Sequence, residues 1–215
     1  VQEYLSGLGV TAYLTLACTL AAYVIGVPIG VILTVTDKDG IRPNRIVNAV
    51  LGFIVNIFRS VPFIILLVIV LPLTKLIVGT KVGNAAFMVP LIIAAAPFVA
   101  RMTESSLKEV DSGVIEAAQA MGSTNFQIIR KVLIPEAKPS LITGAAIAVT
   151  TILGYTPMAT FVGGGGLGAI AVQYGLYRFQ PTIMYIASIL LIIMVQILQE
   201  VGLKLAKKTD KRIKN

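Results

Sequence analysis

Very few side chains in this sequence could carry catalytic chemistry. The 215 residues include no His, ten Asp and Glu, and a single Cys, Cys18, which lies in an apolar run. Zinc fingers, Ser-His-Asp triads and haem or iron–sulfur sites need His or several Cys, and this composition argues against them. No Gly-x4-Gly-Lys-Ser/Thr stretch offers a phosphate-binding loop. We therefore expect no catalytic residue, no metal site and no cofactor in this chain, which would not be an enzyme.

The carboxylate best placed for interaction chemistry is Glu116, in Glu116-Ala-Ala-Gln-Ala-Met-Gly122. Strong helix formers predict a short helix over 114–121, which Gly122 would end in a left-handed conformation. The small Ala117 and Ala118 would permit close approach of a partner. Glu116 could pair with an Arg or Lys across that interface, or it could cap its own loop. Both interpretations are open at this point.

A second short helix is expected directly after Gly122. Thr124-Asn-Phe-Gln127 fits a capping box, in which the Thr hydroxyl and the Gln amide satisfy opposite ends of the first turn. The helix is predicted to run to about Leu133, and Pro135 is predicted to end it. Taken alone, the two helices form a helical hairpin that many membrane proteins could contain.

The elements that must position this hairpin are membrane spans. The chain is 56% hydrophobic and 13% charged, whereas soluble domains carry about 25% charged residues. A helix needs about 20 apolar residues to cross the hydrocarbon core. Five stretches qualify, and we predict an all-α integral membrane protein with one domain, 1–215, whose soluble hairpin segment covers about 107–138. The predicted spans are 11–35, 46–73, 85–104, 141–162 and 183–203.

The basic residues predict the orientation in the membrane. Fourteen of the 18 Lys and Arg lie in 36–45, 101–140 and 199–215, which alternate with the other connections. Because cytoplasmic loops are enriched in Lys and Arg, the N-terminus is predicted outside and the C-terminus in the cytoplasm. The basic tail 204–214 would then meet anionic lipid. It lacks the interleaved aromatic residues of a nucleic-acid platform, so no nucleic-acid partner is expected.

Two sets of polar residues interrupt the apolar stretches and are candidates for a transport pathway or gate. The first is a helical stripe, from Arg45 through Asn48, Gly52 and Asn56 to Arg59. It could line the pathway or a dimer seam, with Asn56 and Arg59 as candidates. Alternatively, 46–58 could lie along the inner interface, with Arg59 reaching the headgroups.

The second set comprises Tyr155, Thr156, Met158 and Thr160 in the fourth stretch. Its hydroxyls could solvate a polar substrate, or bond back to their own helix. Tyr155 and Met158 could form a gate or simply pack.

No Asp or Glu lies in the interior of a predicted span, since Glu104 and Glu200 are near cytoplasmic ends, whereas proton- and sodium-coupled transporters usually place acids inside the membrane. This pattern argues against a small secondary transporter. Such a transporter, or a channel without an ATPase partner, is nevertheless the alternative function.

The hairpin residues also match a family pattern. Glu116-Ala-Ala, three residues, Gly122, nine residues and Val132-Leu-Ile-Pro135 resemble the EAA motif of ABC importer permeases. Val132 and Ile134 replace the Ile and Leu of that pattern. Three further stretches, 56–67, 95–102 and 162–168, resemble methionine-importer permeases in particular, and the similarity covers nearly the whole chain.

The resemblance implies the type I ABC importer permease fold in the bacterial inner membrane. It implies a homodimer, two ATPase subunits that bind ATP and Mg, and an extracytoplasmic binding protein that delivers methionine or a related amino acid. Import would follow alternating access, driven by ATP binding and hydrolysis in the partner subunits. The residues that would couple the chain to its ATPase are Glu116, Ala117, Ala118, Met121, Gly122 and Pro135.

Overall fold

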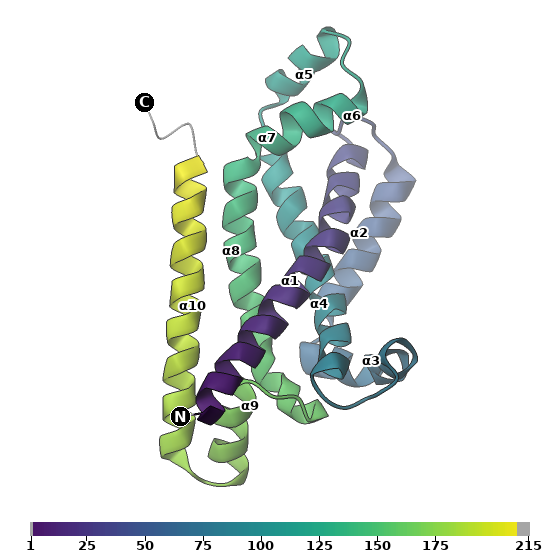
Figure 1. Ribbon diagram of the computed structural model, residues 1–215. Helices are drawn as coiled ribbons and strands as arrows, with labels where there is room; N and C mark the ends of the chain where they lie inside the picture. Colours follow the sequence, from purple (N-terminus) through teal and green to yellow (C-terminus); the bar gives the residue numbers. More distant parts are fainter. Residues whose placement is uncertain (1, 210–215) are drawn as a thin grey trace.

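The computed structural model describes residues 2–209, and every regular element among them is a helix (Figure 1). Part of the predicted basic tail, Lys211, Arg212 and Lys214, lies outside the described residues. The α-helices are α1 Gln2–Thr36, α2 Arg45–Ser60, α3 Phe63–Val78, α4 Asn84–Lys108, α5 Ser112–Ala120, α6 Asn125–Ile128, α7 Ile134–Glu136, α8 Lys138–Tyr155, α9 Leu167–Val172 and α10 Pro181–Thr209. Between them lie the π-helical turns Ile129–Leu133 and Gln173–Tyr177 and the 3-10 segment Thr156–Val162.

Four of these helices are long and apolar enough to cross a membrane: α1, α4, α8 with its 3-10 extension to Val162, and α10. A fifth span is present if the bent pair α2 and α3 is counted as one. Each of the five predicted stretches falls on one of these units. The apolar runs therefore identify the long helices, because an uninterrupted apolar surface of this length is stable in lipid as a helix.

The predicted stretch 46–73 is not one continuous helix. It breaks between Ser60 and Phe63, and α2 and α3 meet there at 109°. Val61 has φ −79° and ψ 123° and Pro62 has φ −55° and ψ 134°, both outside the helical region. Pro62 disfavours the helical conformation for the residue before it and has no N–H to continue the ladder. As a result α3 turns across the end of the molecule instead of extending α2 (Figure 1).

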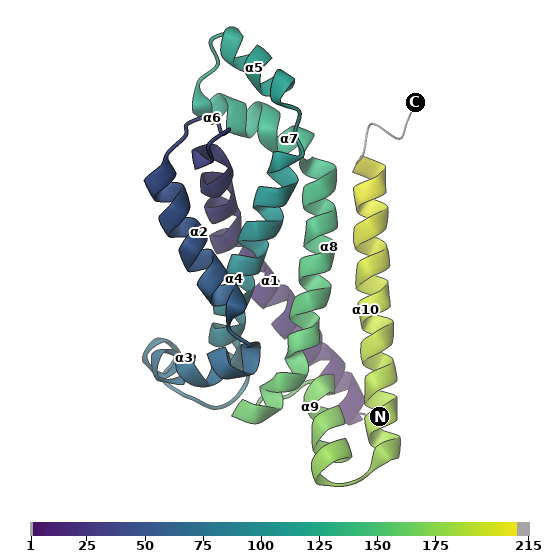
Figure 2. The ribbon, with the colours of Figure 1, turned by 180° about the vertical axis from the view of Figure 1, so that it is seen from behind.

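The centre of the molecule is the crossing of α1 over α4, which is visible from both sides (Figures 1 and 2). Leu14 and Cys18 of α1 and Phe87 and Leu91 of α4 are fully buried there. The two helices approach closely because glycines replace side chains on α1. A Cβ added at Gly30 would lie 2.5 Å from the carbonyl oxygen of Ala100. Small residues at such crossings let helix backbones meet in membranes.

An aromatic cluster fixes the start of α3 where the chain has turned. The ring of Phe63 stacks on Tyr155 at the end of α8, with 4.8 Å between ring centroids, and meets Phe87 of α4 edge-on at 5.8 Å. Phe63 is 7% exposed. The cluster therefore joins three helices at the level of the break after Ser60.

We expect Phe63→Ala to lower the free energy of unfolding by about 3 kcal/mol, since it empties a buried site shared by three helices. Thermal unfolding of the purified chain in detergent would measure the effect. Phe126→Ala is the matched control, because Phe126 is 68% exposed and its truncation should change stability by less than about 0.5 kcal/mol. Equal effects of the two variants would contradict the packing role of Phe63.

The connection after the 3-10 segment is a closely packed glycine turn, 163–166. Gly163 and Gly166 have φ of 67° and 110°, which side chains rarely adopt. The N–H of Gly165 donates to Oδ1 of Asn84 at 2.7 Å, and the N–H of Leu167 donates to Oγ1 of Thr11 at 2.9 Å. These bonds tie the turn to the start of α4 and to the third turn of α1, so it is a fixed part of the fold rather than a loose loop.

Candidate functional site

The hairpin segment between α4 and α8 lies at the end of the molecule where α1 also ends (Figure 1). Its first helix, α5, covers the predicted short helix. Asp111 caps it, accepting a hydrogen bond from the N–H of Gly113 at 2.7 Å. Gly122 follows with φ 77°, and its N–H donates to the carbonyl oxygen of Gln119 at 2.9 Å. The chain can turn sharply here because Gly has no Cβ to clash in this conformation.

The second helix begins with the predicted capping box. The N–H of Gln127 donates to the Thr124 hydroxyl at 3.4 Å, and the N–H of Thr124 donates to Oε1 of Gln127 at 2.8 Å. The predicted end at Pro135 is wrong, since the helical path continues through the π-helical turn Ile129–Leu133 into α7 and α8. Pro135 occupies the first turn of α7, where the ladder does not need its missing N–H.

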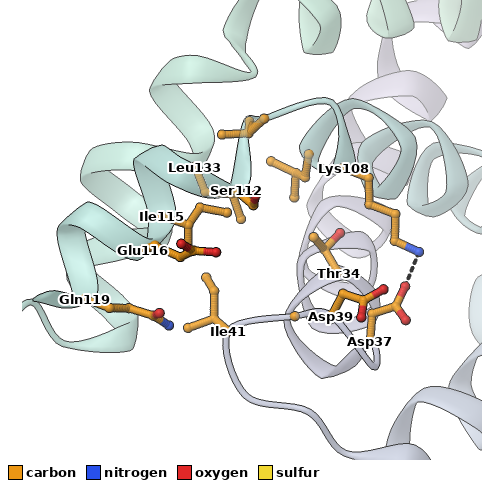
Figure 3. A pocket seen from close by; sticks show the side chains of 13 residues that line it. Thr34, Asp37, Asp39, Ile41, Lys108, Ser112, Ile115, Glu116, Gln119 and Leu133 are labelled. Carbon is orange, nitrogen blue, oxygen red and sulfur yellow. Dashed lines mark ion pairs between the residues drawn. The ribbon is translucent and has the colours of Figure 1, made fainter.

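Glu116 faces a cavity of about 420 Å³ between α5 and the loop that follows α1 (Figure 3). Asp37, Asp39 and Gln119 also line this cavity. Among residues 2–209, the Glu116 side chain makes no hydrogen bond or ion pair within the chain. Because Asp111 caps α5 and Glu116 does not, the Glu116 carboxylate is available to a partner.

The candidate coupling residues divide between two sides of the hairpin. Ala118 is 3% exposed and faces the rest of the chain, whereas Glu116 and Ala117 are exposed. Met121 is 80% exposed and lies at the tip. Two large apolar side chains that the sequence did not single out, Val114 and Phe126, are 43% and 68% exposed on the same hairpin. Exposed apolar side chains beside a free carboxylate are typical of a protein-docking surface.

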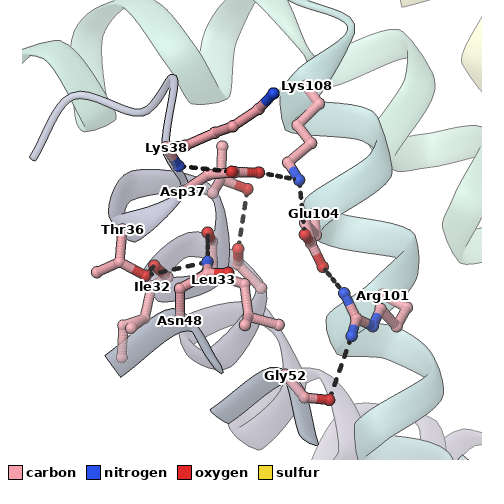
Figure 4. Close-up of polar contacts among 12 residues, drawn as sticks. Ile32, Leu33, Thr36, Asp37, Lys38, Asn48, Gly52, Arg101, Glu104 and Lys108 are labelled. Atoms are coloured by element: carbon pink, nitrogen blue, oxygen red, sulfur yellow. Dashed lines mark hydrogen bonds and ion pairs between the residues drawn. The ribbon is translucent and has the colours of Figure 1, made fainter. Parts of the chain in front are cut away.

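A chain of charged contacts lies beneath the hairpin and was not predicted from the sequence (Figure 4). Glu104 of α4 accepts a hydrogen bond from Nη1 of Arg101 at 2.6 Å and one from Nζ of Lys108 at 2.8 Å. Lys108 also pairs with Asp37 in the loop after α1. The i, i+3 and i, i+4 spacing of Arg101, Glu104 and Lys108 was the available signal in the sequence.

The hydrogen bond from Lys108 holds the pKa of the Asp37 carboxyl below its ordinary value of 3.8. A carboxyl with a lowered folded-state pKa stabilises the fold above its unfolded pKa and loses that contribution as pH falls through the folded value. We expect Asp37→Asn to unfold at a lower temperature than the wild type at pH 6. The difference should shrink as the pH falls below 3.8 and vanish once the pH is below the lowered folded-state pKa of Asp37. Asp39→Asn, at a side chain 83% exposed, should show no such trend, and a pH-independent Asp37→Asn difference would contradict the ion pair.

The polar stripe of α2 faces other helices of the same chain. Nδ2 of Asn48 donates to the carbonyl oxygen of Leu33 at 2.7 Å, near the end of α1. Nη2 of Arg101 donates to Oδ1 of Asn56 at 2.8 Å and to the carbonyl oxygen of Gly52 at 3.3 Å. Arg59, in the last turn of α2, has no such polar partner among the described residues. The stripe thus attaches α2 to α1 and α4.

The second candidate set lies where α8 passes into the 3-10 segment. Tyr155 stacks on Phe63, and Thr156 is 1% exposed with its hydroxyl donating to the carbonyl oxygen of Leu153 at 2.7 Å. Met158 packs against the central core and is partly buried, as is Thr160. The Thr156 hydroxyl therefore bonds back to its own helix, as the second interpretation of these residues proposed. A pathway role for Tyr155, Met158 and Thr160 stays a prediction.

Comparison with known families gives the chain its class. Residues 26–208 match the family of binding-protein-dependent transport system inner membrane components. The chain belongs to this family. As a member, it is an inner-membrane permease subunit of an ABC importer, which agrees with its long apolar helices.

Several individual members of the permease family are similar over most of their length. The "Probable D-methionine transport system permease protein" of Vibrio cholerae is 48% identical over 94% of this chain and 90% of its own. The methionine import system permease of Bacillus subtilis is 43% identical over 84% and 82%. A chain of the methionine ABC transporter MetNI in an inward-facing conformation superposes with a TM-score of 0.96 at 44% identity, covering 98% of both chains.

Proposed function

We propose that this permease imports methionine or a closely related amino acid, as a homodimer that works with two ATPase subunits. The observation that carries the proposal is the superposition on a chain of an inward-facing methionine transporter over 98% of both chains. The two chains are also 44% identical in sequence, so the likeness goes beyond a shared fold, which by itself does not imply function. Two copies would supply two hairpin segments under twofold symmetry, one for each ATPase.

The proposed orientation places the N-terminus outside and the C-terminus in the cytoplasm. In support, the hairpin, the 37–44 loop and the C-terminal end of α10 all lie at one end of the molecule, and the start of α1 lies at the other (Figure 1). That shared end carries most of the basic residues, which favour the cytoplasmic side.

The proposed ATPase-docking surface consists of Glu116, Ala117, Met121, Val114 and Phe126 on the α5–α6 hairpin. Three other residues would support this surface without forming it. Ala118 would allow close packing against the rest of the chain, Gly122 the turn between the helices, and Pro135 the continuous helical path into α8. ATP and Mg would bind in the partner subunits. Among residues 2–209 no group of His, Cys, Asp and Glu could hold a metal ion.

The mechanism we propose is alternating access. ATP binding would draw the two ATPase subunits together, and with them the two hairpins. Because the hairpin continues through helical turns into α8, and α4 ends only four residues before α5, its displacement would tilt the spans and open the pathway outward. Hydrolysis would restore the inward-facing arrangement. The binding protein would deliver substrate at the outer end.

The test is reconstitution. The chain would be purified with its ATPase partner, placed in liposomes with the binding protein, and assayed for uptake of labelled methionine. Uptake should require ATP and should be competed by methionine more strongly than by leucine or histidine. Uptake without the ATPase would favour the alternative of a secondary transporter or channel. ATP-driven uptake of a different amino acid would overturn the substrate assignment alone.

A further inference from the structure

The helix α2 is only loosely packed against the rest of the chain. Of its sixteen residues only Val55 is buried. Ile46, Phe53 and Val50 are 76%, 66% and 55% exposed, so most of its apolar surface faces away from the other helices. Only Val55 and Leu51 join a small apolar cluster with Leu33 and Ala100. A helix with so small an apolar contact depends on its polar contacts for much of its position, and it can move when they change.

Two polar attachments hold α2 among the described residues. Asn48 bonds to the end of α1 near one end of the helix, and Arg101 of α4 bonds to Gly52 and Asn56 further along. The Arg101 attachment lies nearer to the break at Pro62, where α2 turns into α3. Loss of this contact would therefore release the end of α2 that is joined to the bend.

Arg101 joins its own helix, α4, to α2. Its Nη2 atom bonds to α2, while its Nη1 atom donates to Glu104, whose side chain is only 9% exposed. Glu104 also accepts a hydrogen bond from Lys108, the last residue of α4, and Lys108 forms an ion pair with Asp37. Since α5 begins at Ser112, the charged chain runs from α2 to the base of the hairpin (Figure 4).

We propose that Arg101 is a positioning residue for ATP-coupled transport: it passes displacement of the hairpin to α2 through its contacts with Glu104 on one side and with Asn56 and Gly52 on the other. The inference rests on the proposed function, since it needs an ATPase that moves the hairpin. It extends that function because it makes α2, which the hairpin itself does not contact closely, one of the helices that move during transport. No contact of Arg101 with the substrate is required.

The chemistry of the guanidinium group suits this role. Its planar fork presents one donor to Glu104 and another to α2 in a fixed geometry, whereas a Lys ammonium is a point charge on a flexible stem. Arg101→Lys would thus keep a cation beside the buried Glu104 but lose the second arm to α2. Asn56→Ala would remove the acceptor on α2 while leaving Arg101 paired with Glu104.

Both variants would be reconstituted with the ATPase and binding protein, and substrate uptake and ATP hydrolysis measured on the same vesicles. We expect uptake per ATP hydrolysed to fall about tenfold for Arg101→Lys and about fivefold for Asn56→Ala, within the range typical of coupling between sites. The double variant should be no worse than Arg101→Lys alone, because both changes break one contact. Unfolding temperatures should stay near the wild-type value.

Glu200→Gln is the matched control, because it removes an i, i+4 ion pair between Glu200 and Lys204 whose side chains are 62% and 77% exposed. Its uptake per ATP should be unchanged. If the wild type shows ATP-driven uptake and both test variants have the wild-type ratio of uptake to ATP hydrolysis, the inference about Arg101 is wrong while the proposed function stands. A parallel fall of uptake and hydrolysis with a lower unfolding temperature would also overturn it, by showing a purely structural role. Wild type without ATP-driven uptake would overturn the proposed function and the inference together.

Discussion

Glu116→Lys is expected to abolish ATP-driven uptake while the permease still inserts and dimerises. The carboxylate lines a cavity between α5 and the loop after α1, it makes no bond within the described chain, and the same hairpin carries exposed apolar side chains. Reversal of a charge that pairs across an interface typically costs at least about 2 kcal/mol, or roughly 30-fold in affinity. Co-elution with the ATPase during gel filtration, together with uptake in proteoliposomes, would measure both consequences.

Two further variants make the Glu116 experiment specific. Glu116→Gln removes the charge and keeps the shape, so it should weaken association less than the reversal does. Glu136→Lys introduces the same reversal at an exposed position of α7, away from the α5–α6 hairpin, and should leave co-elution unchanged. Wild-type association and uptake in Glu116→Lys would remove this carboxylate from the coupling role.

Gly30→Leu is expected to prevent folding of the permease. A single Cβ at this position would lie 2.5 Å from the carbonyl oxygen of Ala100 and 2.6 Å from Cβ of Thr103, so α1 and α4 would have to separate. Overpacking that shifts the backbone typically costs about 1–3 kcal/mol, and Leu adds three carbons beyond the Cβ that already clashes, so we expect a cost above that range. The crossing of α1 and α4 is the centre of the core, and little else could compensate for its loss.

The measurement is the yield of monodisperse protein in detergent and its unfolding temperature. Gly9→Leu is the matched control, since Gly9 lies on the same helix and a Cβ there meets nothing within 4 Å. We expect Gly9→Leu to purify like the wild type and Gly30→Leu to aggregate. Equal yields would show that the crossing can widen without loss of the fold.

The long helices could be predicted because their signal is local. An apolar run of span length can satisfy its backbone in lipid only as a helix, so composition alone located α1, α4, α8 and α10. The turn after α5 and the start of α6 could be predicted for the same reason, because Gly122 and the Thr124–Gln127 capping box specify them within a few residues.

The break at Pro62 shows why the same reasoning missed the bend of α2 against α3. Pro28, Pro72, Pro90 and Pro97 all lie inside helices of this chain, so a proline in an apolar run does not by itself indicate a break. At Pro62 the stack of Phe63 on Tyr155 fixes the new direction. That contact joins residues far apart in the sequence, and no local pattern reports it.

The candidate site was predicted unevenly for the same reason. The family pattern located Glu116 and its neighbours, whose spacing is short. The contact between Arg101 and Asn56 spans 45 positions, so the helical stripe on α2 suggested a polar face without identifying its partner. Pro135 was misinterpreted as a stop because a π-helical turn, which has no clear sequence signature, precedes it.

The peripheral position of α10 bears on how the protein is made. Only 6% of its most apolar stretch is buried within the chain, and it packs chiefly against α8 and α9. Membrane helices leave the ribosome in order, so α1, α4 and α8 can assemble their shared core before α10 is synthesised. Helix α10 then docks on a surface that α8 and α9 have already formed. Errors in its insertion would therefore leave the central core intact, and quality control would have to detect them at the edge of the bundle.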